Sequence, residues 1–274
     1  MDEIDETDEI TKIIQAHYDE NVLGEWERIA GRPEFLLTCR MLDRYIVPGG
    51  KVLDIGGGPG RYSFELAKKG CGVTLFDLSP ENIRFAEEKA VELNISDKIK
   101  TVCGDARIIN AFVNEQFDYV LLMGPMYHLL EETDRITAVN AALNLLKPGG
   151  IIFVSFIHMG AGIVYLLREA PELVISPDEE RFITPFVSGK SYGGAAFTQA
   201  FFINQNEILP FMAQFPLEKL HLFGQEGILA PNEQNIMSQP PEVVAGWLDL
   251  AEKIWEKEEY LSWSEHLMYV GRKV

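Results

Sequence analysis

Short apolar runs alternate with helical patterns through the middle of the chain. Five such runs lie at residues 51–55, 72–76, 99–103, 119–122 and 151–154. Between the second and third runs, Ile83, Ala86, Ala90 and Leu93 recur at the spacing of one helix face. Strands that alternate with helices in this way are typical of βαβ units in a parallel sheet. We therefore predict a doubly wound α/β core over residues 48–157.

The flanks of this core have other patterns. Residues 1–47 begin with an acidic stretch that we expect to be a frayed tail, followed by helical periodicity that predicts a lid over the sheet. Residues 158–196 are rich in glycine and proline and too long for a plain connection, so we expect an inserted cap. Residues 197–274 resume with strand patterns near 217–223 and 266–270 and a helix near 243–255. The prediction is one sheet of about seven strands, the last antiparallel.

Composition and charge exclude several classes of protein. The 274 residues are 47% hydrophobic and 24% charged, as in ordinary folded proteins. A formal charge of −18 opposes nucleic acid, and no apolar run approaches the ~18 residues that span a membrane. The acidic amino terminus does not resemble a secretory signal. The three cysteines have neither CxxC spacing nor an even count, so we expect no metal site and a reducing, cytoplasmic location.

A glycine-rich loop follows the first strand pattern, in the segment Asp54-Ile55-Gly56-Gly57-Gly58-Pro59-Gly60. Ligands bind beyond the carboxyl ends of parallel strands, and glycine lets the backbone approach them closely. The dinucleotide fingerprint G-x-G-x-x-G fails here, because the sixth position is Arg61 when counted from Gly56 and Ser63 when counted from Gly58. The spacing present is G-x-G-x-G.

This segment resembles the first motif of class I S-adenosylmethionine-dependent methyltransferases, (D/E)-x-G-x-G-x-G. Further segments follow in the order of that family: Phe76-Asp77-Leu78-Ser79, Gly104-Asp105-Ala106, Phe117-Asp118-Tyr119-Val120 and Leu146-Lys147-Pro148-Gly149-Gly150. Together they cover roughly residues 50–156. The resemblance implies a Rossmann-like methyltransferase sheet and S-adenosylmethionine as the cofactor.

The resemblance also implies roles for individual residues in cofactor binding. Asp77 would hold the ribose hydroxyls, Asp54 the cationic methionine end, and Asp105 with Ala106 the adenine ring. The alternative for Asp77 and Asp105 is that they only cap the turns that follow them. The remaining expected cofactor-binding residues are Gly56, Gly58, Gly60, Leu78, Met123 and Tyr18, the last from the lid. The alternative for Tyr18 is that its helix only packs against the core.

The end of the fourth strand carries the expected chemistry. Gly124-Pro125-Met126-Tyr127-His128-Leu129 departs from the (D/N/S)-P-P-(Y/F) motif of enzymes that methylate nucleobases, and resembles a segment of bacterial members presumed to act on small molecules. His128 is the candidate general base, because an imidazole titrates near neutral pH. A purely structural role for His128 is the alternative. Tyr127 beside it is the second candidate catalytic residue, although packing beside the cofactor is its commoner use.

The predicted function is therefore methyl transfer from S-adenosylmethionine to a small-molecule acceptor through its O, N or C atom. Two alternatives stay open: a nicotinamide-dependent oxidoreductase, and a sensor that binds S-adenosylmethionine without catalysis. Cap residues that could shape the acceptor pocket are Tyr165, Arg168, Tyr192 and Phe197. Glu226 follows a strand in a loop from which it could reach the pocket, although a loop carboxylate is usually exposed. His266 is expected in a structural strand position. The acceptor and the oligomeric state are not predicted.

Overall fold

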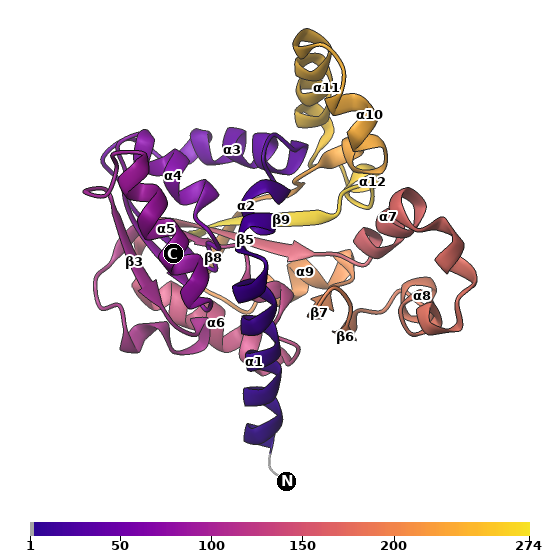
Figure 1. Cartoon of the computed structure of the whole chain (residues 1–274), viewed down its shortest axis with the longest axis horizontal. Helices are drawn as coiled ribbons and strands as arrows, with labels where there is room; N and C mark the ends of the chain where they lie inside the picture. Colours follow the sequence, from indigo (N-terminus) through magenta and orange to yellow (C-terminus); the bar gives the residue numbers. More distant parts are fainter. Residues whose placement is uncertain (1–2) are drawn as a thin grey trace.

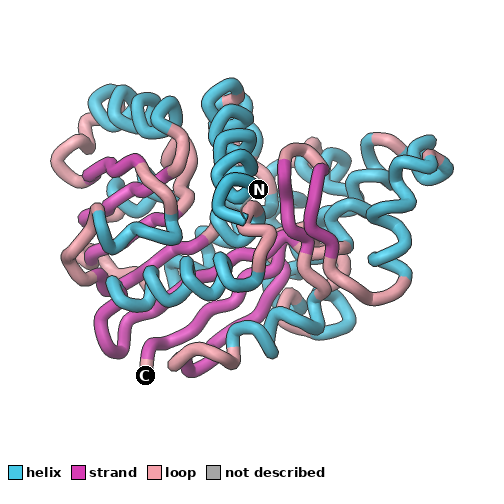
Figure 2. The backbone as a smooth tube through the Cα atoms, turned by 90° about the horizontal axis from the view of Figure 1, so that it is seen from below, coloured by secondary structure: helices cyan, strands magenta, loops and turns pink. Residues whose placement is uncertain are grey.

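A twisted sheet forms the centre of the molecule (Figures 1 and 2). This computed structural model describes residues 3–274, with side chains described from Glu9 onward. Within those residues, the main sheet has seven strands in the order β3-β2-β1-β4-β5-β9-β8. Their bounds are β1 Lys51–Ile55, β2 Gly72–Asp77, β3 Ile99–Cys103, β4 Phe117–Leu122, β5 Leu146–Ile157, β8 Leu217–Gly224 and β9 His266–Lys273.

The first five strands run parallel, and β9 runs antiparallel to both β5 and β8. This arrangement confirms the predicted sheet and its antiparallel last strand. The strand order reverses beside β1, which pairs with β2 on one side and β4 on the other. Loops that leave the carboxyl ends of β1 and β4 therefore diverge and leave a crevice between them.

Helices cover both faces of the sheet, which is why its strands are apolar on both sides. On one face, Val52 and Phe153 pack against α3, α4 and α11; on the other, Leu53 and Val120 pack against α6 and α9. The bounds are α3 Pro33–Tyr45, α4 Arg61–Lys68, α5 Pro80–Glu92, α6 Glu132–Leu145, α9 Gln205–Met212 and α11 Pro241–Ile254. The amino terminus of α5 forms as predicted, because the Ser79 Oγ accepts the Asn82 amide at 3.0 Å.

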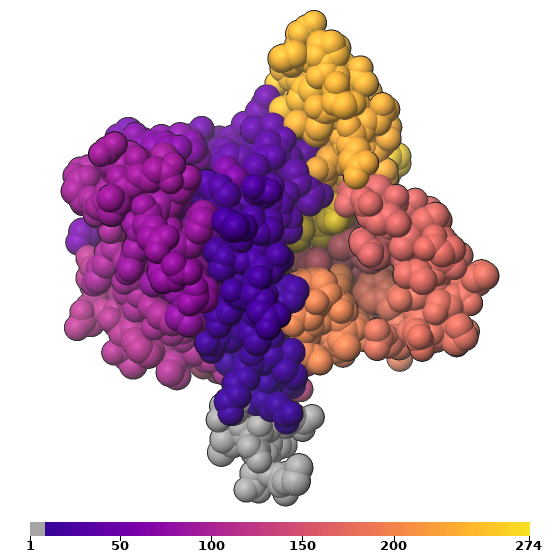
Figure 3. All heavy atoms as spheres, viewed as in Figure 1, coloured from indigo at the N-terminus to yellow at the C-terminus, as the bar shows by residue number. Residues whose placement is uncertain are grey.

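Two further helices precede the core: α1 Glu3–Glu20 and α2 Val22–Arg28. Helix α1 lies between the core and the cap (Figure 3), and its residues Ile10, Ile14 and Tyr18 line the cavity described below. Its backbone is helical from Glu3, so the expectation of a frayed acidic tail over the first ten residues is wrong from that residue onward. Residues 1 and 2 lie outside the described part of the chain.

The insertion after β5 contains α7 Gly160–Glu169, two single-turn helices (Pro171–Ile175 and Pro177–Glu179), α8 Glu180–Val187, and the hairpin β6 Tyr192–Ala195 with β7 Gln199–Phe202. Its two ends meet, because the Met159 amide donates to the Ile203 carbonyl at 3.0 Å. The hairpin carries the insertion beyond the predicted end at residue 196, since β7 pairs with β6 and not with the main sheet. We call residues 158–203 the cap.

The remaining elements connect the strands around the site or close the carboxy-terminal end. They are the single-turn helices η1 Ala106–Ala111, η2 Pro125–Tyr127 and η5 Gly227–Asn232, with α10 Glu233–Met237 and α12 Glu258–Leu261. Among the described residues, the structure has no helix with the length and apolar character needed to cross a membrane.

Candidate functional site

A cavity of about 1150 Å³ opens where β1, β2 and β4 end. Its lining includes all but one of the expected cofactor-binding and catalytic residues, namely Tyr18, Asp54, Gly56, Gly58, Asp77, Leu78, Asp105, Ala106, Met123, Tyr127 and His128. Gly60 is outside the wall and turns the chain into α4 with a φ of 94°. The volume exceeds the ~300–1,000 Å³ of a typical small-molecule pocket, so two ligands can be accommodated.

The glycine loop forms one side of the cavity. Gly56 has a φ of 73°, and a Cβ there would lie 2.5 Å from the Pro125 Cδ. Gly58 has a φ of 55°, and a Cβ there would meet nothing closer than the Asn82 Nδ2 at 4.0 Å. Gly56 is therefore required by its conformation and by the close approach of Pro125, whereas Gly58 combines a left-handed backbone with open space beside it.

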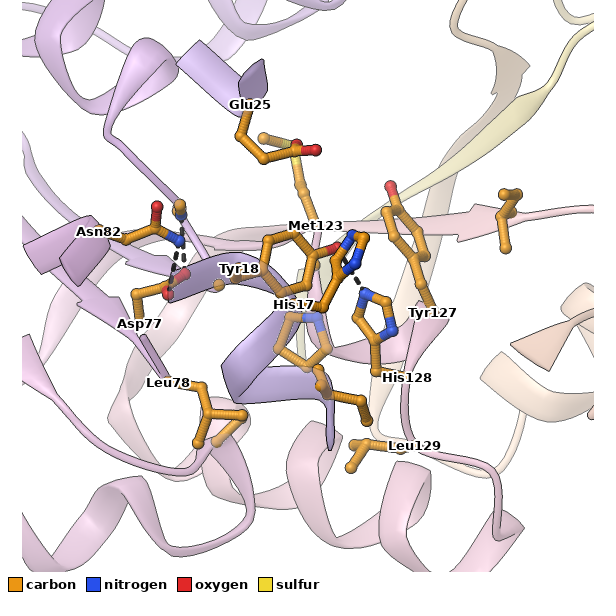
Figure 4. A pocket seen from close by; sticks show the side chains of 18 of the residues that line it. His17, Tyr18, Glu25, Asp77, Leu78, Asn82, Met123, Tyr127, His128 and Leu129 are labelled. Carbon is orange, nitrogen blue, oxygen red and sulfur yellow. Dashed lines mark hydrogen bonds between the residues drawn. The ribbon is translucent and has the colours of Figure 1, made fainter. Parts of the chain in front are cut away.

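Asp77 holds this loop and the start of α5. Its Oδ2 accepts the Gly58 amide at 2.8 Å, and its Oδ1 accepts the Ser79 amide at 2.9 Å and the Asn82 Nδ2 at 3.1 Å (Figure 4). A carboxylate has about four acceptor positions, so one on Oδ2 remains for a ligand. Asp77 thus caps the following turn, which was the alternative to cofactor binding, but it also lines the cavity.

Asp54 lies at the floor of the loop and is 1% exposed. Its Oδ2 accepts the Ser63 hydroxyl at 2.7 Å, while its Oδ1 is buried with no hydrogen-bond partner among the described residues. Burial raises the pKa of Asp54 to about 7, against the opposing effect of the Ser63 bond. A buried acceptor without a donor is costly, and a cationic ligand group in the cavity would relieve that cost.

Asp105 reaches the cavity wall but already has a charged partner. Its Oδ1 accepts the Arg107 amide at 2.8 Å, and its Oδ2 lies 3.0 Å from the Arg107 Nε. Arg107 also binds Asp134 at 2.8 Å. The Asp105 carboxylate therefore caps its turn and pairs with an arginine that the sequence analysis did not anticipate.

Tyr18 and His128 join the lid to the core. The Tyr18 hydroxyl lies 2.7 Å from the His128 Nε2 (Figure 4). The His128 Nδ1 lies 2.9 Å from the Gln199 carbonyl in the cap. Because a carbonyl only accepts, Nδ1 carries the proton and Nε2 accepts from Tyr18. Burial lowers the pKa of His128 to about 4, so the ring is neutral at neutral pH. The sequence-based expectation that this ring titrates near neutral pH is therefore wrong.

Tyr127 directs its hydroxyl away from the glycine loop. It donates to the Ser155 Oγ at 2.5 Å, and Ser155 is bonded in turn to Gln225. Gln225 donates to Thr38 at 2.9 Å, which links β5, the loop after β8 and α3 in one buried chain. The ring of Tyr127 remains in the cavity wall beside His128, with ring centroids 6.2 Å apart.

Beyond Tyr127, the wall becomes charged. We call this side the far half, lined by Arg28, Arg32, Glu34, Arg168, Glu265 and His266, and the opposite side the glycine-loop half. Arg168 is the cap residue that pairs with Glu265 at 2.9 Å. Tyr165 and Phe197 also line the cavity, whereas Tyr192 packs against Phe182 and Phe202 inside the cap.

The far half contains Glu34, which the sequence analysis missed, and His266, which it expected only in a structural role. Glu34 is 5% exposed. Glu226 is fully buried, so it is not an exposed loop carboxylate, and it lies behind the cavity wall without lining the cavity itself. The Glu226 Oε1 lies 2.6 Å from the Nδ1 of His266. Periodicity could not reveal these contacts, because Glu34 occupies a helix pattern and His266 begins a strand.

Part of the chain matches a known family. Residues 52–150 match a family described as a methyltransferase domain, in agreement with the motifs over the same region. A ubiquinone biosynthesis O-methyltransferase of Psychrobacter arcticus is 32% identical over 159 residues, which cover 55% of this chain and 60% of that enzyme. The chain spans about half the length of the curated relatives it matches.

Solved structures share the fold over nearly the whole chain. A 1,6-didemethyltoxoflavin-N1-methyltransferase of Burkholderia thailandensis superposes with a TM-score of 0.61 at 13% identity, covering 97% of this chain and 89% of that one. The [4+2]-cyclase SpnF superposes with a TM-score of 0.56 at 21% identity, covering 90% of this chain and 83% of that one. At these identities the likeness concerns the fold.

Proposed function

We propose that this chain transfers a methyl group from S-adenosylmethionine to a small-molecule acceptor and releases S-adenosylhomocysteine. The observation that carries the proposal is the unpartnered Oδ1 of Asp54, buried at the floor of a G-x-G-x-G loop with Asp77 at the next strand end. The methyltransferase-domain match over residues 52–150 supports the same conclusion.

The residues of the glycine-loop half fit this cofactor. The Asp54 Oδ1 accepts from the ammonium of the methionine end, and the free position on the Asp77 Oδ2 accepts from a ribose hydroxyl. The left-handed backbone at Gly58 lets the ligand approach the loop closely, and Leu78 and Met123 supply apolar contacts at the wall. Asp105 shares its carboxylate between Arg107 and the adenine amino group, beside Ala106.

The cofactor supplies an electrophilic methyl group, so the chain has to align an acceptor atom with it and exclude water. Tyr18 from α1 and Gln199 from the cap both bind His128, which holds the lid and the cap over the cavity. His128 is thus a positioning residue at the centre of methyl transfer, and the Tyr127 ring forms the wall on which the acceptor rests.

The acceptor is a small molecule that enters the far half of the cavity. The relative from Psychrobacter arcticus is named for methylation at oxygen, and the Burkholderia thailandensis methyltransferase structure contains bound 1,6-didemethyltoxoflavin and S-adenosylhomocysteine. A formal charge of −18 argues against a nucleic acid as the acceptor. The cytoplasmic location inferred from cysteine use stays a prediction.

Titration calorimetry with S-adenosylhomocysteine and with NAD separates the proposal from the oxidoreductase alternative. We expect saturable binding of S-adenosylhomocysteine only. A metabolite screen scored by S-adenosylhomocysteine release then separates a methyltransferase from a sensor, since methyl transfer converts the cofactor to S-adenosylhomocysteine and binding alone does not. Binding of NAD in preference to S-adenosylhomocysteine would refute the proposal, and binding without release for any metabolite would favour the sensor.

A further inference from the structure

Glu226 is built into the protein as a fixed anion. It lies in the loop after β8 and is fully buried. Its Oε2 accepts the Ser264 hydroxyl at 2.6 Å, the Glu265 amide at 3.0 Å and the His266 amide at 2.9 Å. These bonds and the nearby charge of His266 lower the pKa of Glu226 despite its burial. Because Oε2 already accepts three hydrogen bonds, only Oε1 of Glu226 remains, and it is bonded to the His266 ring.

His266 lines the cavity and has one ring nitrogen left for a ligand. Its Nδ1 is bonded to the Glu226 Oε1 at 2.6 Å, and its Nε2 has no hydrogen bond to any of the described residues. The ring belongs to the cavity wall and lies 5.5 Å from the ring of Tyr127, centroid to centroid. Burial alone would lower the pKa of His266, but the charges of Glu226 and Glu34 outweigh burial and raise it to about 9. At neutral pH the Nε2 therefore carries a proton that it can donate to a ligand.

Glu34 supplies the complementary acceptor. One carboxylate oxygen of Glu34 and one ring nitrogen of His266 lie within 4.8 Å of each other. A hydroxyl group that bonds to two partners at ~2.8 Å with a near-tetrahedral angle spans roughly 4.6 Å, which lies inside this limit. The other groups whose charge or ring faces His266 are Glu226, Glu265, His158 and Tyr127, and Arg28 neutralises Glu34 from a distance of 3.3 Å.

The geometry points to an acceptor that is a hydroxyl compound, whose hydroxyl group is received between His266 and Glu34, with Glu226 as the positioning residue for His266. This inference rests on the proposed function. The hydroxyl oxygen accepts from the Nε2–H of His266 and donates to Glu34. As the oxygen forms its bond to the methyl carbon, the carbon–sulfur bond breaks with its electron pair remaining on sulfur, and the hydroxyl proton passes to Glu34.

A metal ion is the competing occupant of this cluster, since Glu34, Glu226 and His266 are ligand types for divalent cations. The structure disfavours it because one Glu226 oxygen already accepts three hydrogen bonds and the other is bonded to Nδ1 of the only histidine in the cluster. A cation would have to displace these bonds. The hydroxyl group needs none of them to break.

The test uses the full chain with histidine rings labelled with ¹³C and ¹⁵N, in the presence of saturating S-adenosylhomocysteine. The probes are catechol and the isosteric 1,2-diaminobenzene, and His266→Gln assigns the His266 signals. We expect catechol to shift these signals and the diamine to leave them unchanged. Glu226→Gln should lower the pH at which the His266 ring loses its proton, which a merely structural role would not predict.

Turnover provides the second readout, with S-adenosylmethionine and the same two probes. His266→Gln and Glu34→Gln should each reduce S-adenosylhomocysteine release from catechol about 100-fold, with cofactor affinity unchanged. His221→Gln is the matched control, because His221 is also paired with a glutamate, Glu256, at 2.9 Å, but outside the cavity lining. It should leave release unchanged.

Three results would overturn the inference: preferential methylation of the diamine, unchanged catechol turnover in both variants, or no catechol-dependent shift at His266. Stoichiometric Mg²⁺ or Zn²⁺ that shifts the His266 signals in place of catechol would instead identify a cation site. Absence of S-adenosylhomocysteine binding is a separate failure, that of the proposed function, and calorimetry on the unlabelled chain detects it independently of the ring signals.

Discussion

The two halves of the cavity are assembled in different ways. In the glycine-loop half, the bonded partners are close in sequence: Gly58 and Asp77 are 19 positions apart, and Ser63 and Asp54 are 9 apart. In the far half, Arg32 binds Glu233 from 201 positions away, with 2.7 Å between Nη2 and Oε2. The Tyr18 bond to His128, which joins the lid to the core, spans 110 positions.

The two halves therefore depend on different features of the fold. Consecutive strand ends of a parallel sheet meet at one edge whatever sequence covers them, so the glycine-loop half depends on local motifs. The far half depends on how α2, α3, the cap and β9 pack together, and its charged side chains are held in place by ion pairs with one another. We infer that one half determines cofactor binding and the other determines the choice of acceptor.

Removal of the cap is the strongest test of the inference that the two halves have separate roles. The cap ends meet at Met159 and Ile203, so a short glycine linker can replace residues 160–202 without stretching the core. We expect acceptor turnover to be abolished, because Arg168 and Phe197 leave the cavity wall, while S-adenosylhomocysteine affinity stays within about tenfold. Calorimetry and a turnover assay on the same preparation measure both. Equal loss of binding and turnover in a folded variant would contradict a separate acceptor half.

Asp77→Ala tests the glycine-loop half alone. Loss of a charge-assisted ribose bond and of the contact to the Gly58 amide should weaken S-adenosylhomocysteine binding roughly 10- to 100-fold. Asp118→Ala is the matched control. It is also a strand aspartate, but it binds the Lys51 amide at 2.9 Å, at the start of β1. If both variants bind S-adenosylhomocysteine like the wild type, Asp77 is only a turn cap.

The pH dependence of cofactor binding tests Asp54. Its pKa is raised to about 7 by burial, and only the ionised carboxylate attracts the cofactor's ammonium. Affinity should therefore be full above pH 8 and fall as pH drops through 7, roughly tenfold between pH 8 and pH 6. Calorimetry across that range measures the slope, and Asp54→Asn should bind weakly at every pH. A wild-type affinity independent of pH would exclude contact between Asp54 and the ammonium.

His128 lies where the two halves meet, and we expect its substitution to have the smallest effect on turnover. Because its pKa is lowered to about 4, wild-type turnover should not fall between pH 8 and pH 5 on account of this ring. Both ring nitrogens are already bonded, so His128→Ala and Tyr18→Phe should each cost about tenfold, in KM more than in kcat. A loss of ~10²- to 10⁴-fold in kcat for His128→Ala alone would make His128 the general base.

Local sequence determined the strands, the glycine loop and the aspartates at the strand ends. Periodicity identifies such elements because backbone geometry repeats every two or 3.6 residues, and the Gly56 conformation excludes other residue types. The family motifs located Asp54 and Asp77 in the cavity wall for the same reason, since each follows directly from its place along a strand.

Only the tertiary structure decided how these residues are engaged. Burial, which depends on what covers a side chain, moved the pKa of His128 away from neutral pH. The ion pair between Arg107 and Asp105 depends on the conformation of a long side chain, and no periodic sequence pattern predicts it. Glu34, Glu226 and His266 come from a helix, a loop and a strand that are far apart in the chain. Packing of those elements brought the three together, because buried charges are stable only where the fold provides partners for them.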